Sequence, residues 1–129
     1  MFALAPLVAA LALALAGSGA TSATDLRIAV WPSGPEREGA FVWRLRCDPV
    51  GGTLPRASAA CRRLRALERP FAPVPKNVNC TQIYGGPQVA RVTGTFERRR
   101  VWAKFKRTDG CEIARWNRVR FLFPGAATG

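Results

Sequence analysis

The sequence is short, strongly basic and free of histidine. It has 129 residues, with 20 Lys and Arg against 8 Asp and Glu, and a formal net charge of +12. This length fits one domain. Without His, the chain has no Ser-His-Asp or Cys-His arrangement and no imidazole general base. Its few carboxylates show no paired spacing, so we expect that it is not an enzyme.

The N-terminal segment predicts a signal peptide over residues 1–23. Residues 2–16 are almost all Ala, Leu, Val and Phe, and small residues follow, as in an apolar core and its cleavage region. The apolar run is shorter than the roughly 20 residues of a membrane helix. Cleavage after Ala20 or Ala23 fits the pattern. We therefore expect a secreted, extracellular domain of residues 24–129, without membrane attachment after cleavage.

The chain contains four cysteines: Cys47, Cys61, Cys80 and Cys111. In an exported chain an even number of cysteines implies disulfides. Four cysteines allow three pairings, and the spacing alone does not choose among them. Oxidised cysteines cannot act as nucleophiles, and the chain lacks both His and a C-x-x-C spacing. We therefore expect no metal site and no cofactor.

Alternating apolar residues dominate the first part of the mature chain and predict strands. The first runs over residues 26–31 and the second over 41–47, and the segment 48–55 then breaks the chain with proline and glycine. From Pro55 the apolar residues change to helical spacing, which predicts an amphipathic helix of three or four turns. Its arginines are expected to form the solvated face.

Three prolines in residues 70–79 exclude regular structure there, and residues 80–88 are not periodic. The later elements are a hairpin with strands 89–96 and 101–106 joined by 97–100, a short helical turn over 110–117, and a last strand over 119–123. Five strands and one clear helix predict an α+β fold, with a helix packed on an antiparallel sheet.

The second strand of this hairpin is rich in both cations and aromatic residues. The segment Arg98–Arg107 also contains Trp102 and Phe105, and Phe96 precedes it; its cations are Arg98, Arg99, Arg100, Lys104, Lys106 and Arg107. One hypothesis is a secreted basic module that binds an anionic partner, either nucleic acid or an acidic surface. The simpler interpretation is a charged hairpin whose aromatic side chains turn toward the core.

An extended segment, Cys80-Thr81-Gln82-Ile83-Tyr84, lies between the proline-rich stretch and Gly85-Gly86-Pro87. A loop of this kind is expected to be exposed, yet held at Cys80. From its residues alone it could equally be an ordinary connection in which the cysteine only crosslinks the fold.

The cysteine-containing blocks carry a family resemblance. Cys47-Asp48-Pro49-x-Gly51-Gly52-Thr53-x-Pro55, followed by Ala59-Ala60-Cys61, resembles the signature of the Streptomyces subtilisin inhibitor-like family. Cys80-Thr81-x-x-Tyr84, Val92-Thr93-Gly94-Thr95-Phe96, Val101 and Cys111 follow in the family's order and spacing. The similarity covers essentially the whole mature chain. It implies a secreted inhibitor of subtilisin-type serine proteases.

The resemblance also implies a fold and a reactive site. The fold is a five-stranded antiparallel β-sheet with two α-helices packed on one side and two disulfides, Cys47–Cys61 and Cys80–Cys111. The reactive bond joins Gln82 to Ile83, and Cys80, Thr81, Tyr84 and Gly85 contact the protease. A homodimer can form in such a family, and no nucleic acid is expected as a partner.

The sequence departs from the family pattern in three places, at Gln82, at Gly85-Gly86 and at Arg98. Gln82 replaces the Met, Lys or Arg that many members carry, and because trypsin requires a cation there, we expect no trypsin inhibition. Gly85 and Gly86 replace a stiffer segment and are expected to loosen the loop. Arg98 occupies a position where glycine often supports the hairpin turn.

Overall fold

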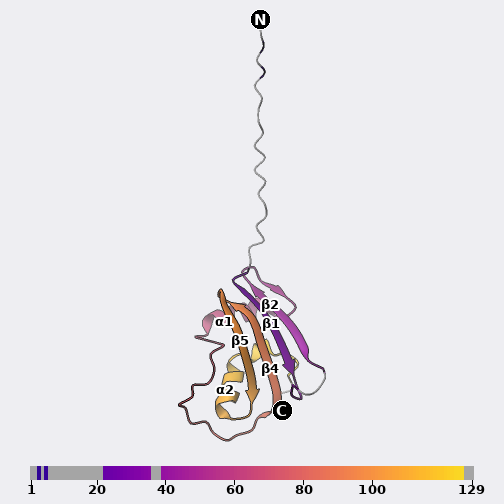
Figure 1. Ribbon diagram of the computed structural model, residues 1–129. Helices are drawn as coiled ribbons and strands as arrows, with labels where there is room; N and C mark the ends of the chain where they lie inside the picture. The colour runs from indigo at the N-terminus through magenta and orange to yellow at the C-terminus, as the bar shows by residue number, and fades with distance from the viewer. Residues whose placement is uncertain (1–2, 4, 6–21, 36–38, 127–129) are drawn as a thin grey trace.

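The computed structural model describes residues 3, 5, 22–35 and 39–126 (Figure 1). The predicted signal peptide lies outside the described residues, except for positions 3, 5, 22 and 23. Among the described residues, no helix has the length and apolar character needed to cross a membrane.

The domain is built on a five-stranded antiparallel sheet with the strand order β3-β2-β1-β4-β5. The strands are β1 (Thr24–Trp31), β2 (Phe41–Cys47), β3 (Gly51–Gly52), β4 (Gly86–Phe96) and β5 (Arg99–Arg107). The predicted alternation is confirmed in β1, where Leu26, Ile28 and Val30 are all fully buried.

The helices α1 (Ala57–Ala66) and α2 (Gly110–Arg118) lie on the same side of this sheet (Figure 1). The core forms between them and the alternate strand residues that face them. Leu64 of α1 and Trp116 of α2 are among its largest fully buried side chains, and Phe105 of β5 packs with them. The α+β fold class implied by the sequence is therefore confirmed.

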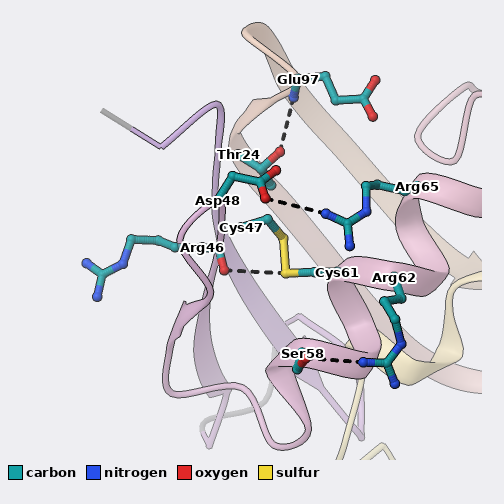
Figure 2. Close-up of a disulfide and its surroundings, with 9 residues drawn as sticks. All are labelled: Thr24, Arg46, Cys47, Asp48, Ser58, Cys61, Arg62, Arg65 and Glu97. Carbon is teal, nitrogen blue, oxygen red and sulfur yellow. Dashed lines mark hydrogen bonds and ion pairs between the residues drawn. A yellow bond between two sulfur atoms is a disulfide. The ribbon is translucent and has the colours of Figure 1, made fainter. Parts of the chain in front are cut away.

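All four cysteines are paired as the resemblance implied, Cys47 with Cys61 and Cys80 with Cys111. The first bridge joins the end of β2 to the middle of α1, beside an ion pair of 3.5 Å between Arg65 and Asp48 (Figure 2). The second joins the segment before β4 to the first turn of α2. The two disulfides thus attach each helix to a different part of the chain.

The expected strand over residues 119–123 is wrong. Arg120–Leu122 form a short 3-10 helix, and Val119, Leu122 and Phe123 are buried together. Their spacing of three and four residues fits a helical turn with one buried side. The ring centroid of Phe123 lies 5.3 Å from that of Phe105 and 4.6 Å from that of Trp116.

The fifth strand comes instead from the segment predicted to be irregular. β3 contains only Gly51 and Gly52, which pair with Arg46 and Leu45 of β2. Two glycines carry no alternating pattern, so periodicity could not indicate a strand there. The hairpin connection is also shorter than expected, because β5 already begins at Arg99.

Candidate functional site: an exposed loop anchored on both sides

The loop that precedes β4 presents its central side chains to solvent. Thr81 and Gln82 are exposed, and Ile83 and Tyr84 expose 61% and 66% of their surface. Large apolar side chains normally contribute to a core, and isolated exposed ones need no explanation. Two adjacent exposed ones on a loop with fixed ends are available for contact with another protein.

The loop is anchored before Gln82 by α2. The Cys80–Cys111 disulfide ties it to the first turn of that helix, and the backbone N–H of Gly110 donates a 2.9 Å hydrogen bond to the Thr81 carbonyl. A Cβ atom at position 110 would overlap Oγ1 of Thr81. Glycine therefore permits the close approach of helix and loop.

The loop is also anchored after Ile83, by the end of β5. The Gly85 N–H donates to the Arg107 carbonyl at 2.7 Å, and Nε of Arg107 lies 3.4 Å from the Gly85 carbonyl. The guanidinium of Arg107 is itself held by Oδ1 of Asn117 at 3.2 Å. A Cβ atom on Gly85 would lie 2.9 Å from Cδ1 of Ile113, so a larger residue here would displace the end of the Ile113 side chain.

Gly85 and Gly86, the two glycines predicted to loosen the loop, lie where the loop joins the sheet. Gly86 is the first residue of β4 and pairs with Arg107 of β5. The missing side chains allow Gly85 to approach Ile113 and make its backbone hydrogen bonds. Backbone hydrogen bonding and strand pairing at Arg107 thus join this end of the loop to the sheet.

The helix that supports the loop has a well-defined start. Asp109 caps α2, with Oδ1 accepting a 2.9 Å hydrogen bond from the N–H of Glu112. Asp109 also lies near the sulfur atoms of Cys80 and Cys111, with all ligand atoms within 4.8 Å of one another. These sulfur atoms are oxidised and offer no thiolate, so this group does not make a metal site.

Arg115 connects α2 to the neighbouring segments. Its guanidinium donates to the carbonyls of Ala72 and Lys104, lies 4.0 Å over the Phe105 ring, and pairs with Glu112 at 3.5 Å. Burial lowers the pKa of Arg115, whereas the charge of Glu112 and its hydrogen bond act to raise it. Arginine remains charged despite such a shift. The hydrogen bonds of its guanidinium therefore connect α2 to the proline-rich segment at Ala72 and to β5 at Lys104.

Gln82 stands at the centre of the exposed part. Its Nε2 lies 3.4 Å from the Cys80 carbonyl, a contact within the loop itself. The amide is neutral and can donate and accept hydrogen bonds. The residue expected at the reactive bond thus projects from a backbone that is fixed on both flanks.

A comparison with protein-family models agrees with this geometry. The model of the subtilisin inhibitor-like family matches residues 9–108, most of the chain, and includes the whole exposed loop. The chain belongs to the subtilisin inhibitor-like family. Membership supports a role as a protease inhibitor, and the family consists of inhibitors rather than enzymes. A comparison with curated proteins finds no match.

The sequence alone did not indicate the residues that position the loop of this subtilisin inhibitor-like chain. Gly110, Arg107 and Asn117 come from β5 and α2, and the fold brings them to the loop. The glycine next to Cys111 was the one available signal, since it is the residue type that permits a close backbone approach. Nothing in the sequence pattern distinguishes Arg107 from the neighbouring cations.

Proposed function

We propose that this chain inhibits subtilisin-type serine proteases by presenting the bond between Gln82 and Ile83 to the protease active site. The observation that supports the proposal most is the two-sided anchoring of an exposed loop. Gln82 would fill the specificity pocket, with Cys80 and Thr81 before it. Tyr84 and Gly85 would follow Ile83 on the leaving side.

The anchoring gives affinity a physical basis. A flexible peptide loses conformational freedom when a protease binds it as an extended strand, whereas a loop already held in place loses less. The hydrogen bonds from Gly110 to Thr81 and from Gly85 to Arg107 fix the backbone on either side of the proposed bond. Much of the ordering cost is therefore met in the free inhibitor.

The same anchors explain why cleavage would not release the protease. Attack by the protease serine on the Gln82 carbonyl breaks the peptide bond and leaves the Ile83 amine. That amine stays near the acyl group because the hydrogen bond from Gly85 to Arg107 and the disulfide between Cys80 and Cys111 both remain. Religation by a tethered amine has a high effective concentration and competes with hydrolysis by water.

A substitution at Gln82 tests which bond is used. In the proposed register Gln82→Lys places a cation in the specificity pocket, and the chain should gain inhibition of trypsin while still inhibiting subtilisin. The matched control Ile83→Lys places the same charge one residue later and should give no trypsin inhibition. If Ile83→Lys inhibits trypsin, or if neither variant does, the proposed bond is wrong.

We also propose that the mature chain acts outside a bacterial cell. The apolar leader and the two disulfides support this proposal, since disulfides persist in oxidising compartments. Expression of the full chain in a bacterial host should yield a culture-medium form beginning after Ala20 or Ala23. Recovery of the uncleaved chain from the cells alone would contradict it.

A further inference from the structure

The face of the sheet that points away from both helices is strongly basic. The register places alternate residues of β2, β1, β4 and β5 in rows across this outer face. Its cations include Arg27, Arg44, Arg46, Arg91, Arg100 and Lys104. Figure 2 shows one of them, Arg46, directed away from α1. The outer face of the sheet therefore gathers cations from four strands that the sequence spreads over more than half of the chain.

The positive charge of the outer face is poorly balanced. Asp25 is the acidic residue in these rows, and its carboxylate lies 3.6 Å from Arg44. A second copy of the chain placed face to face would bring two such surfaces together, and like charges repel at short range. The charge of this face instead fits an anionic partner.

An aromatic side chain projects from the middle of these cations. Trp102 of β5 exposes 72% of its surface and lies beside Thr93 of β4 in the row of Arg27 and Arg44. The expectation that the hairpin aromatics turn inward is thus confirmed for Phe105, which is fully buried, and wrong for Trp102. The alternation of β5 puts these two residues on opposite faces of the sheet.

Arg91 connects the cations with the aromatic residues. Its guanidinium lies 5.8 Å from the ring centroid of Trp31 and 5.5 Å from that of Trp102. Cation–π contacts of this kind hold the Arg91 guanidinium close to the two indole rings. The outer face therefore presents an exposed indole next to several positive charges.

We propose that the outer face binds single-stranded nucleic acid. Cations in a groove or on a sheet neutralise phosphates, and an exposed aromatic side chain stacks a base without sequence preference. Open antiparallel sheets with helices on the far side serve as such platforms in other proteins. This inference does not depend on the inhibitor loop, and it departs from the family resemblance, which suggests no nucleic acid partner.

The experiment measures the fluorescence anisotropy of a labelled oligothymidylate titrated with the oxidised full chain. We expect binding that weakens with salt, with a slope of about −0.7 in log K against log salt for each phosphate neutralised. Trp102→Ala should weaken binding by about fivefold or more, the loss expected for one stacked base. Arg27→Glu with Lys104→Glu should weaken it further.

A matched control separates this face from general charge. Arg62→Glu with Arg120→Glu makes the same charge change on α1 and the 3-10 helix, and both residues are exposed. Equal losses in the two double variants would overturn the proposal. The proposal would also be overturned if heparin bound as tightly as oligothymidylate and Trp102→Ala left both affinities unchanged. A surface that binds any polyanion through charge alone does not need the indole. If sedimentation shows a dimer, and Arg27→Glu with Lys104→Glu dissociates it, the face serves self-association instead. Thermal unfolding of each variant checks that it is folded.

Discussion

Replacement of Gly110 by alanine tests whether the loop is positioned by its contact with α2. The new Cβ would overlap Oγ1 of Thr81, so Thr81 must rotate or shift. Rotation of the side chain does not relieve the 3.2 Å approach to Cβ of Thr81, so the loop backbone shifts as well and weakens the 2.9 Å hydrogen bond from the Gly110 N–H to the Thr81 carbonyl. A neutral hydrogen bond contributes about 0.5–1.5 kcal/mol, and with the added strain we expect a loss near 1.4 kcal/mol, about tenfold in the inhibition constant.

The stability of the fold should respond differently from inhibition. Alanine has a higher helix propensity than glycine, by up to about 1 kcal/mol, and this gain in α2 offsets the lost loop contact. The melting temperature of Gly110→Ala should therefore stay within a few degrees of the parent. A merely structural role for Gly110 would instead change stability and leave inhibition of subtilisin unchanged.

A double-mutant cycle identifies the contact responsible. Thr81→Ala removes the hydroxyl that Gly110→Ala would strike, and the remaining approach of Cβ to the Thr81 Cβ is 3.2 Å. In the Thr81→Ala background the effect of Gly110→Ala on the subtilisin inhibition constant should fall below about threefold, since contacting residues couple by about 0.5–3 kcal/mol. An equal effect in both backgrounds would refute the role of this contact, as would an inhibition constant that Gly110→Ala leaves within twofold.

Three further predictions follow from the described contacts. Arg98 has a φ of 67° in the two-residue hairpin turn, so Arg98→Gly should raise the free energy of unfolding by about 1 kcal/mol and the melting temperature by roughly 4–8 °C; no rise would contradict this. Cys80→Ser with Cys111→Ser opens a bridge of separation 31 and should cost about 3–4 kcal/mol in urea unfolding, while subtilisin should cleave the loop as a substrate; sustained inhibition would count against the tether. Arg115→Ala leaves the carboxylate of Glu112 without its cation at 15% exposure and should cost about 3–5 kcal/mol; a loss below 1 kcal/mol would show that the ion pair is unimportant.

Much of the fold could be predicted because its strands carry a strict alternation. In β2 and β5 the buried residues recur at every second position, as at Val101, Ala103 and Phe105. The same rule failed for β3, which has two glycines, and for residues 119–123, where an apolar run fits both a strand and a helical turn.

The family pattern predicted which loop to examine, but not what holds it. The loop residues are continuous in sequence, and their cysteine marks one anchor. The partners on the other side, Arg107 and Asn117, meet Gly85 only because β4, β5 and α2 converge there. Such contacts depend on the packed fold, so no local propensity indicates them. The exposure of Trp102 could have been predicted, since alternation with buried Val101 and Ala103 already places it on the other face.

The most direct test of the account is a titration of subtilisin with the oxidised chain, with trypsin in parallel. We predict near-stoichiometric loss of subtilisin activity and no loss of trypsin activity. Mass spectrometry should find any cleavage between Gln82 and Ile83, with both pieces still joined by Cys80–Cys111. Full subtilisin activity at excess chain, or cleavage at another bond, would contradict the central claim.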